Sequence, residues 1–193
     1  MVKRRTPDEA RAQLLHAADT LFYSQGLSAT GINQIISTAG VAKATFYSHF
    51  PSKLELALAY LVHRHATWFG MLNAHVAKKR GARSKALAPF SFLEEWLRGV
   101  DFRGCAFLNI QGEHPLPEAL ARQVSEHKEE LRQFFVASLV SLVDDAKERR
   151  FLADHLLLLF EGALVEAQVH RDVWPIRAAL RAAQRLVPTK ENV

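Results

Sequence analysis

The sequence predicts an all-α protein in which an N-terminal helix-turn-helix unit of three helices precedes a body of six helices. Apolar residues recur at spacings of three and four along most of the chain, and no segment alternates as a strand does. A glycine turn also separates two short helical segments near the N-terminus. Pro51 breaks the pattern after them, so we predict two domains, residues 1–51 and residues 52–193.

The charge of the chain is concentrated at its N-terminal end. The 193 residues carry a net charge of +5, and residues 1–53 hold six Lys and Arg against three Asp and Glu. A basic end on a nearly neutral body favours a polyanionic partner at that end. The chain has one cysteine, no apolar signal-peptide core and no apolar run longer than residues 156–160. We therefore expect a soluble cytoplasmic protein without disulfides or membrane spans.

The first predicted helix begins after Thr6, which precedes a proline and stands three residues before Glu9, as in a capping box. Its apolar face continues to Gln25, and Gly26 ends it. The basic residues 3–5 precede this cap; they form either a solvated tail or a short arm that a partner orders.

Two short helices follow, at about residues 31–39 and 42–50, joined by a tight turn at Gly40. Ser52 then caps a long helix of about residues 53–78, with Glu55 in the capping-box position. Further helices are predicted at about 86–99, 105–112, 117–147, 151–170 and 175–186. The cationic residues 78–85 between two of these helices are interpreted as a solvated turn.

A small basic and aromatic helix held by a glycine turn has the shape that enters a DNA major groove. Lys43 and Tyr47 stand near the start of the second short helix, where side chains reach base edges, and its flanks meet phosphates. The N-terminus of the preceding helix adds further donors. The predicted DNA-binding set is Thr30, Asn33, Lys43, Ala44, Thr45, Tyr47, Ser48, His49 and Lys53.

These residues also resemble a known family. The segment AGVAKATFYSHFPSKLEL and the preceding LFYSQGLSATGINQI are similar to the TetR family of bacterial transcriptional regulators, whose consensus is AGVSKGTLYYHFxSKEEL. Ala42, Ala44 and Ser48 depart from that consensus, and Ser48 removes one aromatic phosphate contact. The resemblance implies a homodimer that binds double-stranded DNA at an operator of two half-sites. It also implies release by a ligand held among helices four to seven, and dimerisation through helices eight and nine.

The helix predicted at residues 151–170 is apolar on too many faces for a helix packed on one side only. It either pairs with the same helix of a second subunit or lies at the centre of a monomer core. The predicted dimer interface consists of Leu156, Leu157, Phe160, Ala163, Leu164 and Ala167.

Large aromatic residues gather in the predicted body, together with a few polar ones, as in a pocket for a small apolar or aromatic effector. The predicted pocket consists of Trp68, Phe69, Leu72, Trp96, Cys105, Asn109, Glu113, Phe134 and Glu161. The segment Asp101–Asn109 resembles an FRGCAF-type segment found in one subgroup of the family. Cys105 within it is either an inert buried cysteine or a sensor of oxidants and electrophiles.

No zinc-ligand spacing, nucleophile motif or phosphate-binding glycine loop is present, so we predict no cofactor, no metal and no catalytic residue. The sequence thus predicts a ligand-responsive transcriptional regulator, most simply a repressor. Two alternatives stay open, a transcriptional activator and a helical enzyme or carrier with an incidental helix-turn-helix.

Overall fold

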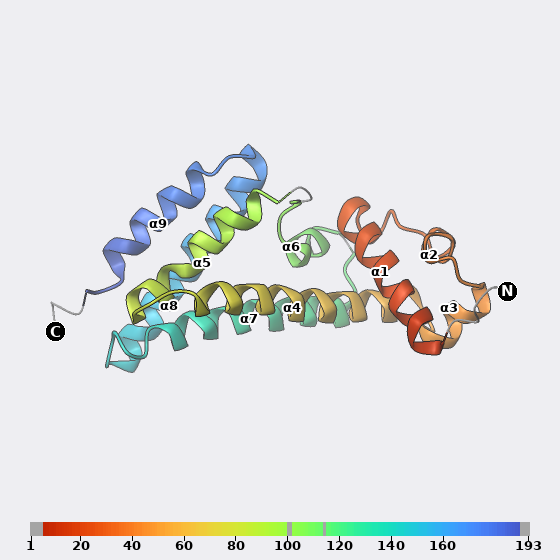
Figure 1. Cartoon of the computed structure of the whole chain (residues 1–193), viewed down its shortest axis with the longest axis horizontal. Coiled ribbons are helices and arrows are strands. Elements are labelled where there is room, and N and C mark those ends of the chain that lie inside the picture. The colour runs from red at the N-terminus through yellow and green to blue at the C-terminus, as the bar shows by residue number, and fades with distance from the viewer. Residues whose placement is uncertain (1–5, 100–101, 114, 190–193) are drawn as a thin grey trace. The chain divides into compact units, whose positions relative to one another are not determined.

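A computed structural model of the chain describes residues 6–99, 102–113 and 115–189 (Figure 1). This part of the chain is all-helical, as the sequence predicts, and no helix in it is long and apolar enough to cross a membrane. The basic residues 3–5 and Asp101 lie outside the described residues. The helices are α1 (Pro7–Gln25), α2 (Ile32–Ala39), α3 (Lys43–His49), α4 (Lys53–Ala77), α5 (Ala82–Leu97), α6 (Ala106–Gln111), α7 (Glu118–Ser138), α8 (Ala146–His170) and α9 (Trp174–Leu186).

The helix starts that carry capping signals lie where the sequence places them. The hydroxyl of Thr6 accepts the Glu9 N–H at 3.2 Å, and the Glu9 carboxylate accepts the Thr6 N–H at 2.8 Å, which completes a capping box. The Ser52 hydroxyl accepts the Glu55 N–H at 3.1 Å at the start of α4. Each bond satisfies a backbone donor that the first turn of a helix leaves unpaired.

Three predicted helix boundaries are wrong. The helix predicted to run to residue 147 ends at Ser138, and α8 begins at Ala146 rather than at residue 151. Asp145 explains this start, because its carboxylate accepts the N–H groups of Lys147 and Glu148. Similarly, α5 begins at Ala82 within the predicted solvated turn.

The chain divides into two compact units. Unit 1 holds the described residues up to Ala66 together with Ala106–Ser125, and unit 2 holds Thr67–Cys105 and the described residues from Glu126 onward. The helix α4 begins in unit 1 and ends in unit 2. The boundary predicted at Pro51 stays a prediction.

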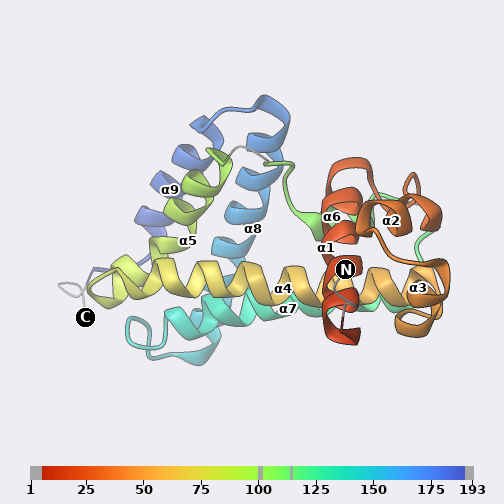
Figure 2. The ribbon, with the colours of Figure 1, turned by 45° about the vertical axis from the view of Figure 1, so that its right-hand side comes forward.

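Each unit has its own apolar core. In unit 1, α1 packs against α2 and α3, and the most deeply buried side chains include Leu14, Ile35 and Phe46. In unit 2, α5, α8 and α9 lie side by side (Figure 2), around buried rings that include Phe90 and Phe160. Burial of these side chains removes apolar surface from water and stabilises each unit separately.

Candidate functional site

The turn between α2 and α3 fixes the angle at which α3 leaves α2. Gly40 adopts the left-handed conformation, with φ 62° and ψ 38°, and its N–H reaches the carbonyls of Ile36 and Ser37. The Val41 N–H also donates to the Ile36 carbonyl, at 3.3 Å. Because an L side chain is unfavourable in this conformation, glycine is needed at position 40. The side chain of Phe46 is fully buried and attaches the inner side of α3 to the core of unit 1.

The outer side of α3 is open and carries most of the predicted DNA-binding residues. Lys43, Ala44 and Ser48 are exposed, Tyr47 is 44% exposed, and Asn33 is exposed on α2. The Tyr47 ring rests edge-on against Phe46, with centroids 5.1 Å apart. The remaining predicted residues of this region, Thr45, His49 and Lys53, are half-buried.

Two hydroxyl groups in the predicted set are already used inside unit 1. The Thr30 side chain is fully buried and donates to the Gly26 carbonyl at 2.7 Å, so it closes the turn between α1 and α2. The Thr30 hydroxyl therefore has an internal partner in this structure, and its predicted role in DNA binding stays a prediction. The Ser48 hydroxyl donates to the Thr45 carbonyl at 2.8 Å, which leaves it only as an acceptor.

Glu113, predicted as an anchor in the ligand pocket, instead binds the turn that follows α1. Its carboxylate accepts the Leu27 N–H at 2.7 Å and the Ser28 N–H at 2.5 Å. Burial raises the pKa of the Glu113 carboxyl, but hydrogen bonds from Ser28 and Leu27 and the charge of Lys53 outweigh it and hold the pKa below its usual range. The segment after α6 is thereby attached to the helix-turn-helix.

The environment of Glu113 constrains two neighbours. Gly26 has a φ of 95°, and a Cβ there would lie 3.0 Å from the Glu113 carboxylate, so the close approach also requires glycine. Burial lowers the pKa of the Lys53 amine, and the charge of Glu113 opposes that shift. Lys53 is predicted to contact a DNA phosphate, and in this structure its charge also interacts with that of Glu113.

The aromatic residues of the predicted pocket pack against one another in unit 2. The Trp68 ring lies 5.6 Å from Phe92, 6.4 Å from Trp96 and 5.5 Å from the buried His127, measured between centroids. Of the other residues in the predicted pocket, Phe69 and Leu72 are buried and Phe134 is half-buried. Asn109, half-buried, belongs to α6 and unit 1.

A cavity of about 540 Å³ adjoins this aromatic cluster through one residue. Phe102 lines the cavity, and its ring lies 5.1 Å from the Trp96 ring. The other lining residues, which include Leu97, Arg103 and Gln168, are absent from the predicted pocket. Sequence reasoning missed them because they come from the end of α5, from the segment that follows it and from the end of α8, which share no periodic pattern.

Cys105 is buried, and an ammonium group lies near its sulfur. The Lys128 Nζ is 3.7 Å from the Cys105 Sγ and donates to both Glu161 carboxylate oxygens, at 2.7 and 2.8 Å. Glu161, predicted as a polar anchor for a ligand, therefore forms an ion pair with Lys128. Among the described residues, no group of three or more His, Cys, Asp or Glu is arranged to hold a metal ion.

The predicted dimer residues of α8 face the interior of their own subunit. Leu156, Phe160, Ala163, Leu164 and Ala167 are buried in unit 2, where α8 packs against α5 and α9. Burial of these five residues matches the alternative of a central core helix, and Leu157 is half-buried; the predicted interface itself stays a prediction.

The opposite face of α8 is apolar and uncovered. Leu158 and Val169 are each 70% exposed, Phe151 is 58% exposed and Val165 is 42% exposed. Gly162 stands among them, and a Cβ at that position would meet no atom within 4 Å. These residues recur at spacings of three and four. They form a second apolar stripe along α8, and this spacing in the sequence could have identified them. We refer to Phe151, Leu158, Gly162, Val165 and Val169 as the outer α8 face.

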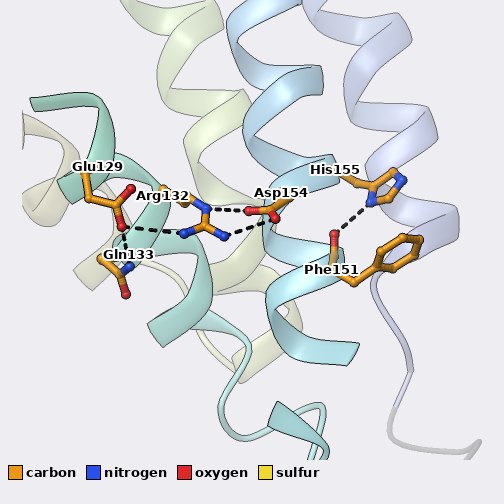
Figure 3. A network of polar contacts seen from close by, with 6 residues as sticks. All are labelled: Glu129, Arg132, Gln133, Phe151, Asp154 and His155. Atoms are coloured by element: carbon orange, nitrogen blue, oxygen red, sulfur yellow. Dashed lines mark hydrogen bonds and ion pairs between the residues drawn. The ribbon is translucent and has the colours of Figure 1, made fainter. Parts of the chain in front are cut away.

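A polar network attaches α8 to α7 next to the outer α8 face (Figure 3). Arg132 donates to both carboxylate oxygens of Asp154, at 2.6 and 3.1 Å, and also pairs with Glu129. Figure 3 shows Asp154 directed toward Arg132, whereas Phe151 and His155 lie on the other side of α8. The bidentate geometry fixes the orientation of the two side chains that join α7 to α8.

Comparison with known proteins shows similarity to one family at both the sequence and the structural level. The family model described as "Bacterial regulatory proteins, tetR family" matches residues 14–60. A solved structure of a TetR-family transcriptional regulator from Streptomyces coelicolor is 30% identical, covers 93% of this chain and 92% of that chain, and has a TM-score of 0.78.

Two curated relatives are similar over different lengths. The transcriptional repressor NemR of Escherichia coli K12 is 23% identical over 97% of this chain and 98% of its own. The crystal structure of its reduced form has a TM-score of 0.81 at 21% identity, covering 93% of this chain and 98% of that one. The transcriptional activator FasR of Mycolicibacterium smegmatis is 52% identical over 54 residues, which are 28% of this chain and 25% of that protein.

Proposed function

We propose that this chain, which belongs to the TetR family of bacterial transcriptional regulators, binds a pseudo-palindromic operator as a homodimer and releases it when a small apolar or aromatic effector binds. As a transcriptional regulator of this family, it is not an enzyme. The observation that carries the proposal is the open side of α3, where Lys43 and Tyr47 stand exposed on a helix fixed by the Gly40 turn.

The exposed residues divide by the contacts they can make. We assign Lys43 to guanine acceptors, and Tyr47 and Ala44 to apolar contact with thymine methyl groups. Asn33, Thr45, His49 and Lys53 lie on the flanks and are assigned to phosphates. The Ser48 hydroxyl can donate to a phosphate only if it gives up its bond to the Thr45 carbonyl.

Binding of the full chain to its own upstream DNA tests these roles. We expect Lys43→Ala and Tyr47→Ala each to cost about 1–3 kcal/mol of operator binding, whereas Lys147→Ala, an exposed lysine on α8, leaves it unchanged. Equal affinities for all four proteins at matched salt would contradict the assignment.

We propose that the homodimer forms through the outer α8 face. Large exposed apolar side chains surround an open glycine there, which favours close approach of an identical helix across a two-fold axis. A two-fold dimer suits half-sites about 34 Å apart.

Charge placed in this face provides the test. We expect Leu158→Glu to sediment as a monomer and to lose operator binding. Val140→Glu is the matched control, because Val140 is similarly exposed (54%) but lies in the turn after α7. A dimeric Leu158→Glu protein would refute this interface.

We propose that the effector binds at the 540 Å³ cavity beside Phe102 and the Trp96 ring. Leu97 and Phe102 give this cavity an apolar side, and Arg103, Gln168 and Arg171 give it a polar one, which suits a small aromatic molecule that carries a polar group. We propose that the effector acts on α4 through the contacts of the Trp96 ring with Phe102 and with Trp68 of α4, since α4 runs from Lys53 in unit 1 into unit 2. Added aromatic compounds should quench the tryptophan fluorescence of the wild-type chain, and this quenching should be lost in Trp96→Phe. Quenching that is unchanged in Phe102→Ala would contradict the site.

We propose repression rather than activation, because two relatives similar over nearly their whole length are named repressors: NemR, and DhaR of Mycobacterium sp. strain GP1, which is 24% identical over 98% of this chain and 97% of its own. The short match to FasR, a named activator, keeps activation as the second candidate. Expression of the neighbouring gene in a deletion strain separates the two: it rises if the chain represses and falls if it activates.

We also propose that the chain belongs to the subgroup with an FRGCAF-type segment. Gly104 in that segment has a φ of 77°, and a Cβ there would collide with the Gln168 side chain, so the segment is closely fitted to α8. Burial of Cys105 favours an inert cysteine over a sensor. Operator release by peroxide in the wild type but not in Cys105→Ser would reverse that choice.

A further inference from the structure

A second cavity in unit 2 lies apart from the residues proposed to bind DNA, the effector or a second subunit. It has a volume of about 630 Å³ and is formed where the end of α4 meets the start of α5, with α9 and the turn after α7 as its other walls. This volume is within the range of pockets that hold small molecules. Its lining includes Lys79, Arg80 and Arg83.

The charge of this cavity is one-sided. Residues 78–85 contain five Lys and Arg and no acidic residue, and no Asp or Glu lines the cavity. Within the part of the chain that the structure describes, none of the three lining cations forms an ion pair. Like charges placed together without counter-charges repel one another and destabilise the fold. This arrangement therefore calls for an anion.

One of the cations is held in place by the fold. Arg83 donates through Nε to the Val187 carbonyl at 3.2 Å and through Nη2 to the Gln184 carbonyl at 2.5 Å, at the end of α9. These carbonyls at the C-terminal end of α9 carry only partial negative charge, so they orient the guanidinium and offset its charge only in part. Lys79 and Arg80 have no such restraint and can close on a ligand.

The floor of the cavity is apolar. Leu87 and Ala88 of α5 are buried beneath it, and Leu142 and Leu180 form half-buried walls. An inorganic anion would leave these side chains uncovered. A ligand with a charged head and a short aliphatic chain would match both halves of the cavity, because burial of the chain removes apolar surface from water.

We propose that this cavity binds an aliphatic carboxylate, with the carboxylate at Lys79 and Arg80 and the chain over Leu142 and Leu180. The site is separate from the proposed effector cavity, since the two share no lining residue. The proposal rests on unit 2 alone and does not depend on DNA binding.

Calorimetric titration of the full chain with octanoate tests the proposal. We expect saturable binding that weakens about fivefold or more in Lys79→Gln/Arg80→Gln, since each partly exposed charge pair contributes modestly. The matched control is Lys147→Gln/Arg150→Gln, which removes the same two charges from exposed positions at the start of α8. Octylamine, with the opposite charge on the same chain, is expected not to bind.

A histidine beside the cavity gives a second readout. The His75 ring bonds Ser91, a lining residue, at 2.8 Å and Glu95 at 3.1 Å. Burial lowers the pKa of His75, Lys79 and Lys78 lower it further, and Glu95 raises it. A carboxylate bound at Lys79 offsets the lysine charges, so we expect the pKa of His75, followed by NMR, to rise on saturation with octanoate.

Three results would overturn the proposal. These are equal weakening of octanoate binding in the two double variants, binding of octylamine as tight as that of octanoate, and an unchanged or lowered pKa of His75 in the octanoate complex.

Discussion

Replacing Glu113 by glutamine should loosen the turn that follows α1. The wild-type carboxylate accepts two backbone N–H groups, from Leu27 and Ser28. A carboxamide has a single acceptor oxygen, so its NH₂ group would face one of these donors. The substitution keeps the size of the side chain, which limits the change to one lost charge-assisted hydrogen bond.

The magnitude follows from the position of that bond. A hydrogen bond to a charged group contributes about 1.5–3 kcal/mol, and the exposure of Ser28 places this one at the low end. About 1.4 kcal/mol corresponds to a tenfold change in an equilibrium constant. Local opening of the turn should therefore become about tenfold more frequent.

Amide hydrogen exchange of Leu27 and Ser28 measures this opening directly. We expect the protection of both amides to fall in Glu113→Gln and to stay at the wild-type level in Glu126→Gln, an exposed glutamate on α7. Because the pKa of Glu113 is lowered in the folded chain, its contribution is present at neutral pH and is lost as the pH falls through that lowered value. Wild-type protection of both amides in Glu113→Gln at pH 7 would refute this reasoning.

Three further substitutions test other parts of the structure. Thr6→Ala removes the cap of α1 and should cost about 1 kcal/mol in urea unfolding; no change would show that the capping box is unimportant. Asp154→Asn breaks the pair with Arg132, which holds the pKa of the Asp154 carboxyl below its usual range. The variant should therefore be slightly less stable than the wild type at pH 7 and equally stable in acid, where the wild-type carboxyl is protonated. A stability difference that does not depend on pH would contradict this. Gly104→Ala, at positive φ and against Gln168, should cost more than about 1 kcal/mol in thermal unfolding, and an unchanged melting temperature would contradict the strain.

The sequence predicted the helix-turn-helix well because its signals are local. Thr6, Ser52 and Gly40 act on backbone groups within a few residues of themselves, so their roles can be derived from spacing alone. The exposed positions on α3 follow for the same reason, since a short helix with one buried phenylalanine, Phe46, leaves its other side open.

The sequence was less informative where packing between residues distant in the chain decides which side chains are buried or paired. On α8 both faces are apolar, and only contact with α5 and α9 shows that Leu156 is inside and Leu158 outside. Glu113 is distant in sequence from Leu27, so its role as an acceptor for that turn has no local signal. The start of α8 did have a local signal, because Asp145 and Glu148 match the spacing of a capping box. The apolar periodicity of the segment obscured it.

The most direct test of the central claim is selection of binding sites from a random pool of duplex DNA by the purified full chain. We predict enrichment of an inverted repeat whose half-sites are centred about 34 Å apart along the duplex, with the enriched bases changing in Lys43→Ala. Enrichment of no sequence, or of a single unrepeated site that Lys43→Ala selects equally well, would contradict a dimer that reads DNA through α3.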